Sequence, residues 1–297
     1  MKTLREYIKE AHQHHVGIGH FNFGTMTMLR GILKAAQEAS DELDHPFVDG
    51  KIPIIVGVSE GDREIFGEIE AVSLVKMMRE VYEYPIFIDA DHTHGKESLD
   101  PVFRVIDLGY DMVIYDGIKE GYETNLKKTN EVVVYKNDVN PECIIEAELG
   151  FISSGSDLKD SLPEGIGPEA MTDPAEAKKF VETTGIDALA PSVGNVHGMI
   201  KSGNPALDHT RIAEVAEATG VPLVLHGGSG VSDEDFVKAI KAGIRIIHLS
   251  TEIRKIYRET LEQQLASDPS VSPTHYLPAC EDAVKELVKG RIALFLS

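Results

Sequence analysis

Three histidines stand where apolar runs of the chain end, and each is a candidate metal ligand. His92 follows PIFIDAD, His197 lies within SVGNVHG, and His226 closes VPLVLH. Imidazole nitrogens from separate strands are typical zinc ligands, and three of them leave a coordination position open for a substrate. A lone histidine is more often a packed or surface residue, so the hypothesis depends on a fold that brings all three together.

Carboxylates accompany these histidines. In an extended strand Asp91 points to the side opposite His92, which favours an acid/base role over ligation of the same ion, with a strand-end cap as the alternative. Asp116 and Glu148 follow or close further apolar runs, and they could hold a second or alternative divalent ion or orient the histidines. His94 is expected to be a neighbour in the site or on its rim.

Two glycine-rich segments suggest an anion site. HGGSG at 226–230 leads into a helical pattern, and backbone N–H groups near a helix N-terminus bind phosphate. GNVHGMIK at 194–201 adds a lysine that could hold the same phosphate, although an ordinary surface loop is the alternative. The candidate phosphate groups are Gly198, Lys201, Gly227, Gly228 and Ser229.

Eight strand patterns alternate with helical ones, which predicts a parallel sheet covered by helices. Eight such units predict one α/β domain over 1–297, a (β/α)8 TIM barrel with an extra N-terminal helix (3–14) and a C-terminal helix (280–290). An open doubly wound sheet is the alternative, but HFNFGTMT after the first run is not its G-x-G-x-x-G turn. The expected strands are 16–22, 52–58, 85–90, 111–115, 142–149, 186–191, 221–226 and 244–249, and the expected helices between and after them are 25–40, 68–82, 97–108, 119–136, 173–184, 208–219, 232–242 and 251–266.

A barrel of this kind carries its active site where the strands end, so the candidates above are expected to converge on one mouth. The same reasoning adds the polar residues that end other strands: Asn22, Ser59, His248, Ser250 and Thr251.

Composition limits the partners. A net charge of −20 opposes nonspecific binding to nucleic acid or to an anionic membrane. The sequence has no apolar run of membrane-spanning length, and MKTLREYIKEAHQHH lacks the apolar centre of a signal peptide. The two cysteines, Cys143 and Cys280, are far apart in the sequence, which suits a reducing cytoplasm.

The motifs resemble those of the class II, metal-dependent fructose-bisphosphate aldolase family. The matching stretches are DADHTHG, IEAELG, GNVHGMIKSGNP, VPLVLHGGSGVSDED, TEIR and the C-terminal YLPACEDAVKELVKGRIALF. The resemblance implies reversible cleavage of a ketose 1,6-bisphosphate, with fructose 1,6-bisphosphate expected first, to dihydroxyacetone phosphate and glyceraldehyde 3-phosphate. It also implies a homodimer or higher homo-oligomer, one catalytic Zn²⁺ per chain, and room for a second or alternative divalent ion and a monovalent cation.

The resemblance also implies roles for individual residues. His92, His197 and His226 match the zinc ligands, and Asp91 matches the acid/base that acts on the aldol hydroxyl. Asp116 and Glu148 match second-metal positions. Arg254 matches a cation that in some members reaches the distal phosphate of the neighbouring subunit's substrate. Groups around dihydroxyacetone phosphate are matched by Ser59, Gly198, Gly227, Gly228 and Ser229.

Three positions differ from the family pattern. The family's proton-transferring loop Glu is replaced by Ser156 in a Gly/Ser-rich segment (151–172) that we expect to act as a mobile lid. We expect Asp157 or Glu164 to take the catalytic role of that Glu, with His94 and His248 as the next candidates. His248 stands where an Asn usually stabilises the enediolate, and Ser250 stands where fructose-selective members carry Asp. These differences bear on substrate and rate more than on fold or metal.

Other functions remain to be weighed. A tagatose-bisphosphate or other ketose-phosphate aldolase would use the same residues. A metal-dependent hydrolase on this barrel would also use scattered His and Asp ligands, but such enzymes usually take His-x-His from the first strand, whereas His92 and His94 follow the third. A non-catalytic sugar-phosphate binder is the third hypothesis.

Overall fold

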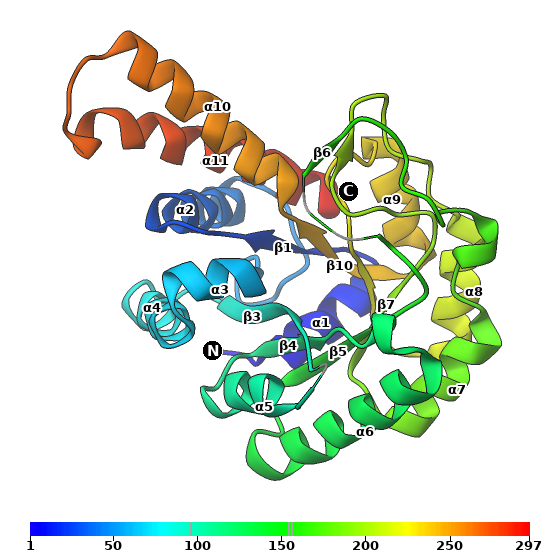
Figure 1. Cartoon of the computed structure of the whole chain (residues 1–297). Coiled ribbons are helices and arrows are strands. Elements are labelled where there is room, and N and C mark those ends of the chain that lie inside the picture. Colours follow the sequence, from blue (N-terminus) through cyan, green and yellow to red (C-terminus); the bar gives the residue numbers. More distant parts are fainter. Residues whose placement is uncertain (96, 154, 156) are drawn as a thin grey trace.

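Eight parallel strands close into a barrel in the computed structural model, which describes residues 1–95, 97–153, 155 and 157–297. Their order around the barrel is β1–β10–β9–β7–β5–β4–β3–β2, so the last strand pairs with the first (Figure 1). The predicted TIM barrel is therefore confirmed, and the open doubly wound sheet is wrong. The barrel strands are β1 (Ile18–Asn22), β2 (Ile54–Ser59), β3 (Ile86–Thr93), β4 (Met112–Tyr115), β5 (Ile144–Leu149), β7 (Ala188–Pro191), β9 (Leu223–Leu225) and β10 (Ile244–Leu249).

The strands are rich in Ile, Val and Ala and are buried almost throughout, as expected for a sheet covered on both faces. Their register sets candidate residues side by side. Ser59 of β2 lies opposite Asp91 of β3, and His20 of β1 lies opposite His248 of β10. Polar side chains that look unrelated in the sequence thus share one end of the barrel.

Helices follow the strands and cover the outside of the barrel (Figure 1). The predicted start of the helix at 232 is confirmed, since the Ser232 hydroxyl accepts the Asp235 N–H at 3.2 Å. The helices are α1 (Leu4–His14), α2 (Met26–Glu42), α3 (Glu60–Phe66), α4 (Glu68–Val81), α5 (Asp100–Asp107), α6 (Tyr122–Val139), α7 (Pro174–Thr184), α8 (His209–Thr219), α9 (Asp233–Ala242), α10 (Thr251–Ser267) and α11 (Pro273–Phe295), with short 3-10 turns at Ile118–Glu120 and Pro168–Ala170.

The structure adds three features to the predicted elements. Helix α3 was missed because it is seven residues long and buries one side chain, Arg63, so no apolar stripe marks it. Helix α11 is longer than the predicted 280–290 and forms with α10 a hairpin that projects past α2 (Figure 1). Two short strands, β6 (Leu158–Lys159) and β8 (Met199–Ile200), pair outside the barrel.

No helix within the described ranges is both long and apolar enough to cross a membrane.

Candidate active site

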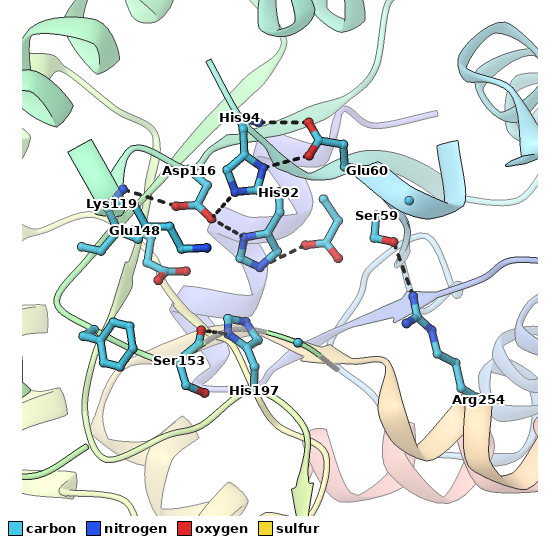
Figure 2. Close-up of a pocket in the computed structure, with 15 residues that line it drawn as sticks. Ser59, Glu60, His92, His94, Asp116, Lys119, Glu148, Ser153, His197 and Arg254 are labelled. Carbon is cyan, nitrogen blue, oxygen red and sulfur yellow. Dashed lines mark hydrogen bonds and ion pairs between the residues drawn. The ribbon is translucent and has the colours of Figure 1, made fainter. Parts of the chain in front are cut away.

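Two cavities that share Asp91, His92 and His197 open at the carboxyl ends of the barrel strands. The smaller, which we call the inner cavity, has a volume of about 30 Å³ and is lined by Asn22, Asp91, His92, His197, Gly198, His226, Gly227, Ser229, His248, Ser250 and Thr251. The outer cavity has a volume of about 260 Å³ (Figure 2) and is lined by Ser59, Glu60, Gly61, Asp91, His92, His94, Asp116, Ile118, Lys119, Glu148, Phe151, Ser153, Gly155, His197 and Arg254.

The inner cavity is lined entirely by residues that the sequence nominated. Four further candidates, Ser59, Asp116, Glu148 and Arg254, line the outer cavity. Gly228 lies beside them, and its N–H donates to the His248 carbonyl at 3.2 Å. The fold therefore gathers most of the predicted site at one place.

The three candidate metal ligands converge. Together with Glu148, each of His92, His197 and His226 offers one ligand atom, and these atoms all lie within 4.8 Å of one another. His197 Nε2 and His226 Nδ1 are 3.3 Å apart, about the spacing of two nitrogens bound 2.0–2.1 Å from a tetrahedral zinc ion. The donor set of imidazoles and one carboxylate suits a divalent transition metal.

Each histidine is oriented by a partner on its other nitrogen. His92 Nδ1 lies 3.1 Å from Asp116 Oδ2, and His197 Nδ1 lies 2.9 Å from the Ser153 carbonyl oxygen (Figure 2). His226 Nε2 lies 2.7 Å from Glu146 Oε1, deep in the barrel. Such partners fix the ring and leave one nitrogen that could bind a metal ion, here His92 Nε2, His197 Nε2 and His226 Nδ1.

The protonation of these groups follows their surroundings. Burial lowers the pKa of His197 to about 4 and that of His226 well below its ordinary value, so both are neutral, as ligands must be. Burial alone would lower the pKa of His92 too, but the neighbouring carboxylates, Asp91 first among them, outweigh it and raise the pKa to about 10. His92 is therefore protonated in the metal-free site and would have to release a proton to bind a metal ion. Burial also raises the pKa of Glu148 to about 8.

Asp91 and His92 lie on the same side of the mouth, which corrects the expectation from strand alternation. His92 has a φ of +51°, in the left-handed region, so the backbone turns between the two residues instead of staying extended. As a result both side chains line both cavities, with Asp91 Oδ1 3.9 Å from His92 Nε2. The predicted acid/base role of Asp91 therefore cannot be argued from its pointing away from His92, and its other contacts must be considered.

Those contacts hold Asp91 as a carboxylate. Asn22 Nδ2 donates to its Oδ2 at 2.6 Å, and His248 Nδ1 lies 3.6 Å from its Oδ1. Burial would raise the pKa of Asp91, but His92 and His248 outweigh it and hold the pKa well below its ordinary value. Asp91 is thus ionised.

A second buried layer contains His248, which the sequence analysis nominated, together with His20 and Asp89, which it did not. The rings of His20 and His248 stack with centroids 3.4 Å apart, and His20 Nε2 is 2.9 Å from Asp89 Oδ2. Burial raises the pKa of Asp89 and raises that of Glu146 well above its ordinary value. The sequence did contain a signal for these two residues. Asp89 stands two positions before Asp91, and Glu146 stands two positions before Glu148, and side chains two positions apart on a strand point to the same face.

The glycines of the mouth are required by close backbone packing. Gly227 has a φ of +64°, and a Cβ there would lie 2.2 Å from the Val196 carbonyl oxygen. Gly198 has a φ of +89°, and a Cβ there would lie 2.4 Å from the Asp157 carbonyl oxygen. Any other residue would be strained at both positions and would displace the loops that line the inner cavity.

Two candidates, Lys201 and Asp157, lie outside both cavities, and a third, Ser156, is not among the described residues. Lys201 is turned away from both cavities, with its Nζ 2.7 Å from Asp160 Oδ1 and its side chain 66% exposed. Its predicted place beside the phosphate loop is therefore wrong for this structure, because a surface carboxylate holds it. Asp157 is exposed in a groove beside Thr251 and Arg254, outside both cavities. Ser156 lies outside the described residues.

Arg254 faces the outer cavity of its own chain. Its Nη2 donates to Asp62 Oδ2 at 2.6 Å. The same Nη2 donates to Ser59 Oγ at 3.4 Å (Figure 2). Asp62 and Glu60, both on the missed helix α3, were not nominated from the sequence, and neither was Lys119 on the opposite side of the cavity. None of them ends an apolar run, which explains why the strand-end criterion passed over them.

Comparisons with known proteins agree with this geometry. Residues 2–297 match the family model described as fructose-bisphosphate aldolase class-II. The fructose-bisphosphate aldolase of Staphylococcus epidermidis is 33% identical over 297 residues (99% of this chain, 96% of the relative), and that of Staphylococcus aureus is 34% identical with the same coverage. The crystal structure of the YdjI aldolase from Escherichia coli K12 superposes with a TM-score of 0.80 at 27% identity, covering 99% of this chain and 97% of that one.

Proposed function

The chain belongs to the class II fructose-bisphosphate aldolase family, and we propose that it cleaves fructose 1,6-bisphosphate reversibly to dihydroxyacetone phosphate and glyceraldehyde 3-phosphate with one Zn²⁺ per chain. The observation that carries the proposal is the clustering of His92, His197 and His226 beside the ionised Asp91 in one mouth. Their other nitrogens are held by carboxylates or a carbonyl, which leaves three nitrogens directed at one point.

His92, His197 and His226 are the residues that would hold the ion, and Glu148 is the nearest additional ligand. A divalent ion held there supplies Lewis-acid polarisation of the substrate ketone. Asp116 orients His92 in this arrangement, and Asp116 and Glu148 remain our candidates for a second or alternative divalent position.

Asp91 takes the proton of the C4 hydroxyl in the cleavage direction. As that O–H bond breaks, the C4 carbonyl forms, the C3–C4 bond breaks, and its electron pair stays on C3 and delocalises toward the C2 carbonyl. Asn22 keeps the accepting carboxylate in place through its 2.6 Å hydrogen bond. In the synthetic direction the same proton returns from Asp91 to the new C4 oxygen.

We assign His248 to stabilising the negative charge that develops on C3 and the C2 oxygen. It lines the inner cavity, and its Nε2 has no hydrogen-bond partner among the described residues. Burial lowers the pKa of His248 to about 3, so the ring is neutral and can donate one N–H without adding a charge. It thereby replaces the amide that the family usually places there.

The two phosphates bind at opposite ends of the mouth in this account. Gly198, Gly227, Gly228, Ser229 and Thr251 surround the dihydroxyacetone phosphate end, where Ser229 also accepts the Glu252 N–H at 3.2 Å. Ser59 and Arg254 lie together at the far side of the outer cavity, which suits the distal phosphate. Binding there requires Arg254 to share its charge between Asp62 and the ligand.

Product identification tests the proposal against its alternatives. Purified protein supplied with zinc and fructose 1,6-bisphosphate should release two triose phosphates and no inorganic phosphate. Release of inorganic phosphate would identify a hydrolase, and binding without turnover would identify a sugar-phosphate binder.

We also propose that the loop 151–172 delivers the proton that C3 needs after cleavage. The variants Asp157→Ala and Glu164→Ala, made separately, should identify the proton donor. Replacing the donor should lower kcat by about a hundredfold, the lower end of the range for general acid catalysis. Metal content should be unchanged in both variants. Both side chains are exposed in this structure, so the loop must close to bring either inward. Unchanged kcat in both variants would contradict proton delivery by the loop 151–172. His248 or His94 would then be the remaining candidates for the proton donor.

Ser250 should make the enzyme tolerant of the C4 epimer, tagatose 1,6-bisphosphate. Its hydroxyl lines the inner cavity and has no hydrogen-bond partner among the described residues, so it is available to the sugar but carries no charge. A charged hydrogen bond is worth about 1.5–3 kcal/mol, about 10- to 150-fold in selectivity. Ser250→Asp should therefore raise the ratio of kcat/KM for fructose over tagatose bisphosphate by about that factor. A wild-type preference above about a thousandfold that Ser250→Asp leaves unchanged would show that the choice is made elsewhere.

We propose further that the chain is a single cytoplasmic domain that assembles at least as a homodimer. Two buried thiols, Cys143 and Cys280, support a reducing compartment. Ile65 on α3 and Ile69 on α4 are 89% and 61% exposed, which supports a subunit interface on that side. Sedimentation of wild type against Ile65→Lys measures the assembly.

A further inference from the structure

A pair of side chains on the rim of the outer cavity is joined to the metal-ligand cluster by hydrogen bonds. Glu60, the first residue of α3, places its Oε2 3.0 Å from His94 Nδ1 and its Oε1 3.4 Å from the His94 backbone nitrogen. Two contacts from one carboxylate fix both the ring and the backbone of His94.

His94 continues this connection inward. Its Nε2 lies 3.2 Å from Asp116 Oδ2, the same oxygen that lies 3.1 Å from His92 Nδ1 (Figure 2). The other Asp116 oxygen accepts the Ile118 N–H at 3.3 Å. Asp116 is therefore held from two sides while it orients a metal ligand.

His94 is not itself a member of the ligand cluster. Among the described residues three groups have converging ligand atoms, the one with His92 being His92, Glu148, His197 and His226, and none of the three includes His94. Both ring nitrogens of His94 face carboxylates instead. A His-x-His pair in which both histidines bind one metal ion is thus not what this strand end forms.

His92 is the ligand with the greatest need of such support. Its side chain is 22% exposed, against 1% for His226, and its backbone occupies the left-handed region. The surrounding core does not restrain its ring as it restrains that of His226, so the hydrogen bond that His92 Nδ1 donates to Asp116 must do so.

We propose that Glu60 and His94 are positioning residues that set the metal affinity of the site by fixing Asp116, and through it the His92 ring. The inference rests on the proposed function, because it takes His92 to be a metal ligand. Partners that orient ligating histidines typically change metal affinity about 10- to 100-fold when removed. His94 acts one hydrogen bond further out, so about tenfold is expected.

Two isosteric variants of His94 separate positioning from packing. In His94→Gln the side-chain amide nitrogen takes the place of Nε2 and can still donate to Asp116. In His94→Asn it takes the place of Nδ1, so the contact with Glu60 is kept and that with Asp116 is lost. Zinc affinity, measured by competition with a chromophoric chelator, should fall about tenfold in His94→Asn and stay within about twofold of wild type in His94→Gln.

Three further measurements complete the test. Glu60→Ala, which removes both contacts with His94, should weaken zinc binding more than His94→Gln does and less than His94→Asn does. The visible absorption of the cobalt-substituted protein should change in His94→Asn and not in His94→Gln. His209→Asn removes a His–Asp ion pair outside the site (3.1 Å to Asp235) and should bind zinc as wild type does.

Equal zinc affinity in His94→Asn, His94→Gln and wild type would overturn the proposal, and so would an equal loss in the two variants, which would indicate packing alone. The readout does not use substrate. Tight zinc binding without aldol cleavage by wild type would therefore refute the proposed function and leave this inference intact.

Discussion

Asp91→Asn is expected to lower kcat for fructose 1,6-bisphosphate cleavage by about a thousandfold, within the 10²- to 10⁴-fold range of general acid–base catalysis. The amide keeps the shape of the side chain and can still contact Asn22 and His248, but it cannot accept the C4 hydroxyl proton. Asp91 is not one of the four clustered ligands His92, Glu148, His197 and His226, although with His226 and His248 it forms another group of possible ligands. Because we assign the ion to the three histidines, zinc content should stay at one ion per chain. Steady-state kinetics and elemental analysis on the same preparation measure both quantities.

The matched control for this variant is Asp107→Asn, which changes an exposed carboxylate bound to the Tyr135 hydroxyl. It should leave kcat and zinc content unchanged. Loss of zinc in Asp91→Asn would contradict the division of roles between Asp91 and its neighbour His92, and unchanged kcat would remove Asp91 from the reaction altogether.

His226→Ala should lose zinc and activity together. Its Nδ1 is one of three nitrogens directed at the ion, and Lewis-acid stabilisation worth several kcal/mol disappears with the metal. A loss of about 4 kcal/mol corresponds to about a thousandfold in rate. Inductively coupled plasma analysis of the dialysed protein, followed by a turnover assay with added zinc, gives the result.

His226 also contacts the buried Glu146, so a folding defect must be separated from a metal defect. His197→Ala, which removes the nitrogen 3.3 Å away, provides that separation and should lose zinc in the same way. His275→Ala, an exposed residue 3.5 Å from Asp268, should retain both zinc and activity. A folded His197→Ala protein that keeps zinc and turnover would contradict the assigned ligand set.

The convergence of the histidines was predictable because it follows from topology. Parallel strands in a closed barrel end at one mouth, so residues at 92, 197 and 226 meet although more than a hundred positions separate the first from the others. Each strand could be read from its own apolar run. The order of the strands and the positions of their ends were therefore enough to predict that the three histidines converge.

Backbone irregularities were not predictable in the same way. Strand alternation assigned Asp91 and His92 to opposite sides, but a positive φ at His92 and the register shift between Ala90 and Thr93 bring them to the same side. Nothing local in DADHTHG indicates this conformation, because His is not a residue that requires it.

Pairings between distant side chains were also beyond the sequence. Lys201 was assigned to a phosphate by its spacing from Gly198, but Asp160 from the loop 151–172 holds it outside the mouth. Conversely, Glu60 and Asp62 reach the site from a seven-residue helix with no apolar stripe. The pairing of charged side chains at the surface depends on the conformation of the loops, and the hydrophobic periodicity of the sequence does not predict that conformation.

The central claim, a metal-dependent ketose-bisphosphate aldolase built on His92, His197 and His226, is tested most directly by removing and restoring the metal. Wild-type protein is treated with a chelator, dialysed, verified as metal-free by elemental analysis, and assayed for triose phosphate release from fructose 1,6-bisphosphate before and after one equivalent of zinc. The account predicts no turnover above background in the metal-free protein and recovery with zinc. Full turnover in the verified metal-free protein would contradict it.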